Sequence, residues 1–277
     1  MLFVIFKLFD RYKVNTFNAI VINYIIACVI GILLNPAPVN LSSIVQRPWF
    51  SGAVLLGFLF INVFVVMART AQTNGLSVAS IAGKMSLIIP VIFGVFAYHE
   101  TMGPLKLTGI LLALAAVYLV SVKKEAALNF KQNLTYPLLL FLGSGIIDTG
   151  LKYLENYYVQ KEEFSIYSAS IFGTAAFMGI LMIIYRKLTG RSTLRLKDIL
   201  GGIVLGIPNY FSIYFILMAL RENDLDSATV FTINNVGIVM ITTFAGILLF
   251  GERLNKRNWF GVMMAIVSIF VIAYVKN

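Results

Sequence analysis

Two ionisable residues, Lys84 and Asp148, lie deep inside uncharged apolar runs, in the stretches SIAGKMSLIIP and GSGIIDTG. A charge at the centre of a bilayer costs roughly 2.5–3.5 kcal/mol on insertion scales, so such residues are functional candidates by default. We predict a gate, a coupling pair or an anchor for a charged substrate group, and a direct ion pair is geometrically possible. The alternatives are a buried salt bridge that only fixes packing, or an Asp148 that faces a watery vestibule.

A second set of candidates is uncharged. Asn62, Asn209, Tyr210, Asn234 and Asn235 all fall well inside apolar runs. Amide and phenol groups at this depth can bind a polar substrate, but they also hydrogen-bond neighbouring helices, which contributes about 0.6 kcal/mol per bond. Both interpretations stay open for each residue.

A charged phrase occurs twice, as FKLFDRY around Lys7 and as LKYLENY around Lys152. Each Lys is followed three residues later by an acid, which lies on the same face of a helix. We expect both lysines to anchor helix ends at the membrane interface. Glu100 and Glu252 stand at turns between apolar runs, where we expect them to cap the next helix.

The composition indicates an integral membrane protein. The 277 residues are 59% hydrophobic and only 12% charged, and the mean hydropathy is +0.88. Globular domains average about 25% charged residues. The net charge of +10 resides almost entirely in short segments between apolar runs, where basic residues orient membrane helices. Nucleic-acid binding is therefore not expected.

The chain lacks the residues for a metal or cofactor site. Cys28 and His99 are the only residues of their types, so neither a disulfide nor clustered ligation is expected. GSGIIDTG lacks the Gly-Lys-Ser/Thr ending of a phosphate-binding loop. We predict no metal, no cofactor and no enzymatic activity.

Nine apolar runs are long enough to cross a membrane, since about 20 residues span the hydrocarbon core. They cover residues 17–34, 49–69, 76–98, 104–122, 137–158, 164–185, 198–220, 225–250 and 257–275. Residues 1–9 are apolar but too short, and we interpret them as the end of a first span that is either truncated at the N-terminus or degenerate. The predicted fold class is all-α integral membrane, with ten spans.

The spans repeat. Phe60, Phe64 and Met67 return as Phe211, Phe215 and Met218 at an offset of 151, and Gly94 and Glu100 return as Gly246 and Glu252 at an offset of 152. Because each unit has five spans, an odd number, the two copies are inverted in the membrane. Inverted repeats are typical of secondary transporters, which place their substrate sites near the midplane.

With this architecture the chain resembles the drug/metabolite transporter superfamily, EamA-like branch. The resemblance rests on AYHETMGPLKLTGILLALAAVYLV, residues 97–120, and on LFGERLNKRNWFGVMMAIVSIFVIAY, residues 249–274. It implies transport of a small metabolite by alternating access, through a cavity lined by spans one, three, four, six, eight and nine. The predicted boundaries are 1–122 for the first repeat, 123–136 for a linker and 137–277 for the second repeat.

The function expected is a secondary transporter, an exporter (efflux permease) of a small polar metabolite such as an amino acid. Its partners are a small-molecule substrate, membrane lipid and, as one option for coupling, protons. Its expected location is the bacterial cytoplasmic (inner) membrane. A polytopic intramembrane enzyme or a membrane scaffold without transport activity is the alternative.

The charge bias and the family resemblance give opposite orientations. Loops after odd-numbered spans hold fourteen Lys and Arg residues, and the other loops with the tail hold six. Positively charged loops stay in the cytoplasm, which places both termini outside. The resemblance implies termini inside, so orientation stays open at this point.

Overall fold

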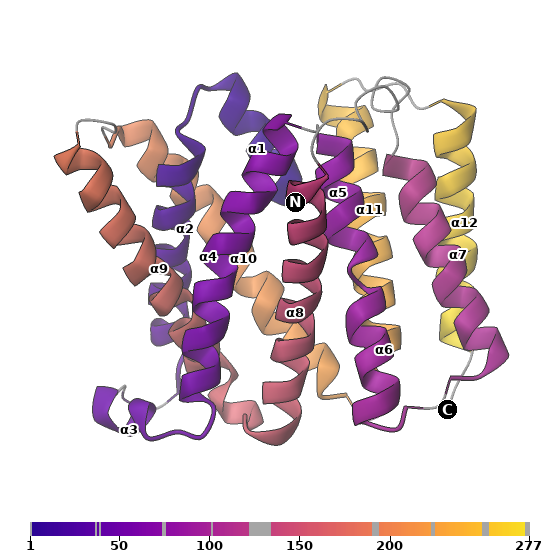
Figure 1. Cartoon of the computed structure of the whole chain (residues 1–277), viewed down its shortest axis with the longest axis horizontal. Coiled ribbons are helices and arrows are strands. Elements are labelled where there is room, and N and C mark those ends of the chain that lie inside the picture. The colour runs from indigo at the N-terminus through magenta and orange to yellow at the C-terminus, as the bar shows by residue number, and fades with distance from the viewer. Residues whose placement is uncertain are drawn as a thin grey trace. The chain divides into compact units, whose positions relative to one another are not determined.

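The computed structural model describes residues 2–36, 38, 40–73, 76–100, 102–121, 134–189, 194–222, 225–250 and 255–274. Within these ranges every regular element is a helix, and no strand occurs (Figure 1). The elements are α1 (Leu2–Arg11), α2 (Thr16–Leu33), α3 (Leu41–Val45), α4 (Phe50–Thr73), α5 (Leu76–Met85), α6 (Ile88–Ala97), α7 (Pro104–Ser121), α8 (Thr135–Tyr157), η2 (Lys161–Glu163), α9 (Phe164–Leu188), α10 (Leu196–Leu220), α11 (Ser227–Phe250) and α12 (Lys256–Tyr274). The predicted all-α class is confirmed.

Seven segments in the described part are long and apolar enough to cross a membrane. They are Thr16–Leu33, Phe50–Thr70, Val78–Ala97, Thr135–Tyr157, Lys161–Leu188, Leu196–Leu220 and Ser227–Leu249, and a shorter apolar helix covers Pro104–Leu119. A helix that is apolar on all sides is suited to lipid. The integral membrane architecture is thus supported, whereas ten spans and an inverted repeat stay predictions.

The chain divides into two compact units. Unit 1 comprises residues 1–65 and 150–221, and unit 2 comprises residues 66–149 and 222–277. Each unit therefore combines helices from both halves of the chain. The boundaries predicted for the repeats follow the chain order instead, and most of the predicted linker lies outside the described residues.

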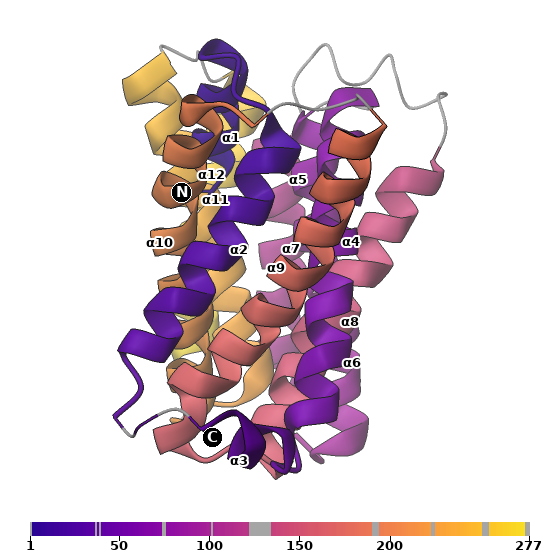
Figure 2. The same ribbon diagram turned by 90° about the vertical axis from the view of Figure 1, so that its left-hand side faces the viewer.

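Unit 1 is built around α2, which packs against both α9 and α10 (Figure 2). Glycines permit the close approach of these helices. A Cβ added at Gly202 of α10 would lie 2.4 Å from the Cβ of Ile22, and one added at Gly57 of α4 would lie 2.5 Å from the carbonyl oxygen of Ile171. Small residues at helix interfaces are the usual means of close packing in membranes.

We expect Gly57→Ala to lower the thermal unfolding temperature of the detergent-solubilised protein, because its methyl group would collide with backbone. Overpacking of this kind costs about 1–3 kcal/mol. Gly237→Ala in α11 is the matched control, since nothing lies within 4 Å of a Cβ added there. Equal melting temperatures for the two variants would contradict the packing described here.

Unit 2 is built around the pair α7 and α12, with α11 beside them. Small side chains form its core, namely Ala113 and Ala116 of α7, Val236 of α11 and Ala265 of α12. Alanine and valine allow the three helices to approach closely, as small residues do in membrane bundles. This core supports α11, which carries part of the site described next.

Candidate functional site

The predicted span 76–98 is broken near its middle. Helix α5 ends at Met85 and α6 begins at Ile88, as Figure 1 shows. Pro90 accounts for the break, because proline has no N–H to donate and its ring collides with the carbonyl four residues earlier. That carbonyl, of Ser86, instead accepts from the N–H of Ile89 at 2.9 Å. The break places the last turn of α5, with Lys84, beside irregular backbone.

Lys84 reaches from α5 to α11. Its Nζ donates a hydrogen bond to Oδ1 of Asn235 at 3.0 Å, and Asn235 is buried. Lys84 also lies close enough to Asp148 of α8 for the two charges to interact, and both charged side chains are partly buried. The structure therefore brings together three of the residues that the sequence singled out. We call Lys84, Asp148 and Asn235 the polar cluster.

Helix α8 is continuous through Asp148, so its small residues serve close packing and do not unwind the helix. A Cβ added at Gly145 would lie 2.3 Å from Cδ1 and 2.7 Å from Cβ of Ile89 in α6. In α5, a Cβ built on Gly83, the residue before Lys84, would lie 3.9 Å from the Oγ of Ser144 in α8. The packing of α8 onto the break in α5 and α6 thus brings Asp148 near Lys84.

All three side chains start far from the ends of their spans. Counted along the helices at 1.5 Å per residue, Lys84 lies roughly 9 Å, Asn235 roughly 12 Å and Asp148 roughly 13 Å from the nearer end. The polar cluster therefore offers an ammonium, an amide and a carboxylate inside the hydrocarbon core. This arrangement can bind a polar solute through two kinds of donor and an acceptor.

The remaining uncharged candidates differ in their surroundings. In unit 1, Nδ2 of Asn209 donates to Oδ1 of Asn23 at 3.0 Å between α10 and α2, and Tyr210 is buried with its ring stacked on that of Tyr214. For Asn209 and Tyr210, these contacts support the interpretation that the side chains pack helices together rather than bind a substrate. Asn62 is exposed, and its amide donates to the carbonyl of Phe58. Asn234 is partly buried in α11.

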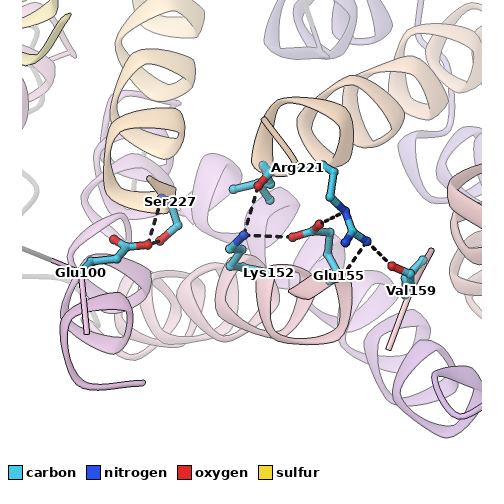
Figure 3. A network of polar contacts seen from close by, with 7 residues as sticks. Glu100, Lys152, Glu155, Val159, Arg221 and Ser227 are labelled. Atoms are coloured by element: carbon cyan, nitrogen blue, oxygen red, sulfur yellow. Dashed lines mark hydrogen bonds and ion pairs between the residues drawn. The ribbon is translucent and has the colours of Figure 1, made fainter. Parts of the chain in front are cut away.

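Among the predicted helix-end anchors, Lys152 takes part in a buried network in unit 1 (Figure 3). Its Nζ donates to Glu155 at 3.0 Å and to the carbonyl of Leu220 at 3.1 Å. Arg221 pairs with the same carboxylate at 2.7 Å, and it also donates to the carbonyl of Val159. The side chain of Lys7 and the whole of Glu252 lie outside the described residues.

Glu100 caps a helix in unit 2, but the helix that its recorded bonds cap is α11, whereas the sequence predicted a cap on the next helix along the chain, α7. Its Oε1 accepts from the backbone N–H of Ser227 at 3.0 Å and from the hydroxyl of the same residue, at the first turn of α11 (Figure 3). Gly94 leaves room for this carboxylate, because a Cβ there would lie 2.9 Å from Oε2. A carboxylate at a helix N-terminus is stabilised by the helix dipole. The same end holds the buried ion pair of Lys106 with Asp226.

We expect the free energy of unfolding to decrease at low pH, because Asp226 becomes protonated there. Burial acts to raise the pKa of this carboxyl, but hydrogen bonds from Lys106 and from the N–H of Thr229 outweigh it and hold the pKa below its ordinary value. A depressed carboxyl pKa stabilises the fold above about pH 4 and loses that contribution as the pH falls through the folded pKa. Thermal unfolding between pH 3 and 6 measures this.

In that experiment Asp226→Asn lowers the melting temperature at pH 6 and flattens its pH dependence. Exposed Glu222→Gln serves as the control. Identical pH profiles for native protein and Asp226→Asn would contradict the assignment.

Residues 137–274 match the sequence model described as the EamA-like transporter family. Residues 137–274 therefore belong to the EamA-like transporter family. The chain is also 29% identical, over 222 residues, to an uncharacterized protein of Haemophilus influenzae, covering 79% of this chain and 74% of that one. A solved crystal structure is similar with a TM-score of 0.75 and 13% identity, over 99% of this chain and 93% of that chain, which shows a shared fold.

The EamA-like domain contributes Asp148 and Asn235 to the polar cluster, whereas Lys84 comes from the part of the chain before it. Among the described residues, no group of three or more His, Cys, Asp or Glu could hold a metal ion. The family match indicates that the protein is a membrane transporter and that its substrate is a small molecule.

Several structural residues were not singled out from the sequence. Asp198, at the start of α10, is buried and accepts from the backbone N–H of Asn15 at 2.8 Å and from the amide of Asn18 at 3.1 Å. Lys106 was counted only as a loop charge, and Asp226 was not considered. The positions of the two acids in the sequence could have indicated their roles. Asp198 lies in the first turn of a long apolar helix and Asp226 lies directly before one, and carboxylates at such positions cap N–H groups.

Proposed function

We propose that the protein is a secondary transporter that exports a small polar metabolite, such as an amino acid or a related compound, across the bacterial cytoplasmic membrane. The chain forms two inverted five-span repeats, residues 1–122 and 137–277, joined by a linker at 123–136. The two repeats move against each other, so that a central site opens in turn to each side of the membrane. The polar cluster is that site. No enzymatic activity is required of it.

One observation carries the proposal. Lys84 and Asn235, which share a hydrogen bond at 3.0 Å, are separated by 151 positions. This is the offset at which Phe60 and its neighbours return in the second half of the chain. Equivalent residues of two copies meet where an axis of two-fold symmetry passes between the copies. Transporters with inverted repeats bind substrate near such an axis.

The family match supports the same division of the chain. The matched segment, residues 137–274, coincides with the second repeat expected from the sequence. The transporter description also favours this function over an intramembrane enzyme or a scaffold.

The roles within the cluster follow from its chemistry. An ammonium has three N–H donors, and the recorded bond to Asn235 uses one of them. The others can donate to an anionic or carbonyl group of the solute. Asp148 accepts from a cationic or amino group, and it is also the residue that would exchange a proton if export is driven by a proton gradient.

Transport by purified protein in liposomes tests this proposal. A panel of amino acids and related polar metabolites is offered in a counterflow assay, with and without a pH gradient. We expect at least one solute to move faster than in protein-free liposomes. Asp148→Asn should slow counterflow, because the solute loses its anionic partner, and should abolish the response to the gradient. The proposal fails if no member of a broad panel is carried.

A further inference from the structure

One end of unit 1 is assembled from the end of α1, the start of α2, the end of α9 and the start of α10. Contacts between these elements define it. The backbone N–H of Asn15 donates to Asp198, Nζ of Lys197 donates to the carbonyl of Tyr12 at 3.3 Å, and the guanidinium of Arg186 lies 4.3 Å from the ring centre of Phe17. We call this end the basic end.

Its surface is strongly positive. Six basic residues gather there, namely Arg11, Lys13, Arg186, Lys187, Arg195 and Lys197. The acid described at this end, Asp198, is buried and already accepts from three N–H donors. The sequence also has Asp10 in this region, although its side chain is not described. With six basic residues and two acids, the basic end has an excess of four positive charges.

The opposite end of unit 1 is nearly balanced. Its basic residues are Arg47, Lys152, Lys161 and Arg221, and its acids are Glu155, Glu162 and Glu163. Most of them are paired, because Glu163 binds Arg47 at 3.0 Å and Glu155 binds both Lys152 and Arg221. The difference between the two ends is therefore one of net positive charge, within a single compact unit.

Exposed apolar and aromatic side chains accompany the positive charges. Tyr12 and Tyr185 are each 65% exposed, and Leu188 and Leu196 are 81% and 72% exposed. Tyrosine is typical of the boundary between headgroups and acyl chains. Arg and Lys beside it can lay their alkyl stems along apolar surface and extend their charges into the headgroup layer. The basic end thus has the composition of a membrane-interface surface.

We propose that the basic end binds the anionic headgroups of phospholipids in the cytoplasmic leaflet. The location in a cytoplasmic membrane rests on the proposed function, but the binding itself does not. Clusters of four to eight Lys and Arg next to a membrane helix attract anionic lipid, and such clusters are retained on the cytoplasmic side. The surface therefore fixes the orientation that the sequence left open, with the connection between α1 and α2 in the cytoplasm.

Lipid binding is measured on the purified full chain by titration with phosphatidylglycerol or phosphatidylcholine and native mass spectrometry. We expect preference for phosphatidylglycerol. The double substitution Lys13→Gln with Lys187→Gln removes two exposed charges and lowers the affinity on the order of 25-fold, since each Lys or Arg near the surface contributes about fivefold. Arg47→Gln with Lys161→Gln at the opposite end is the matched control, with a change below about twofold expected.

The outcomes separate the alternatives. Equal affinity for the two lipids, equal losses in the two double variants, or equal binding of soluble glycerol phosphate each overturn the proposal. Orientation has its own readout. With Cys28 replaced by Ser, Lys13→Cys should react with an impermeant maleimide in inside-out vesicles and Lys161→Cys in right-side-out vesicles, and the reverse pattern overturns the assignment to the cytoplasmic leaflet.

Discussion

Proteoliposomes that contain the Lys84→Met protein are expected to lose solute counterflow by roughly 10- to 100-fold. Hydrogen bonds to a charged group contribute about 1.5–3 kcal/mol, and about 1.4 kcal/mol corresponds to tenfold in affinity. Methionine has nearly the length of lysine and suits apolar packing, so α5 should keep its place. The variant removes the ammonium that bonds Asn235 at 3.0 Å and leaves the solute without its cationic donor.

Lys161→Met is the matched control, because Lys161 is exposed in η2. The control should exchange solute at the native rate. The melting temperatures of both variants are measured in parallel, since removal of a partly buried charge should not unfold the protein. Native counterflow by the Lys84→Met protein would show that this ammonium takes no part in binding.

The second large effect concerns stability. Glu155→Ala leaves Lys152 and Arg221 without their shared carboxylate, and Glu155 is only 1% exposed. Removal of one partner from a buried ion pair costs about 3–5 kcal/mol. We expect about 3 kcal/mol here, because the Arg221 side chain is 34% exposed and water compensates part of the loss. That value lowers the melting temperature by roughly 6–12 °C.

Glu162→Ala is the control for this variant, since Glu162 is exposed near the same end of unit 1. Thermal unfolding in detergent compares the two. A shift as small as that of the control would mean that the network in Figure 3 does not stabilise unit 1.

The helices of this protein follow from its apolar runs. The run 198–220 appears as α10, Leu196–Leu220, and the run 164–185 as α9, Phe164–Leu188. Long uncharged segments have one stable backbone in lipid, because every N–H and C=O must be bonded within the segment. The break in the run 76–98 was not anticipated, although Pro90 carries the physical reason for it.

The partner of Lys84 illustrates what a linear pattern cannot predict. Position along a helix is countable from the sequence, and a direct ion pair of Lys84 with Asp148 was geometrically possible on that basis. Rotation about the helix axis depends on packing, and here α8 is set by Gly145 against Ile89. In the structure the hydrogen bond of Lys84 goes to Asn235. The repeat offset of 151 was available in the sequence, and it would have pointed to that residue.

Exchange of the two residues tests the central claim most directly, namely that inverted copies meet at Lys84 and Asn235 around a solute passage. Counterflow is measured for Lys84→Asn, for Asn235→Lys and for the variant that carries both changes. If the positions are equivalent, each single variant loses exchange and the double variant recovers most of the native rate. A double variant no better than either single variant contradicts the claim.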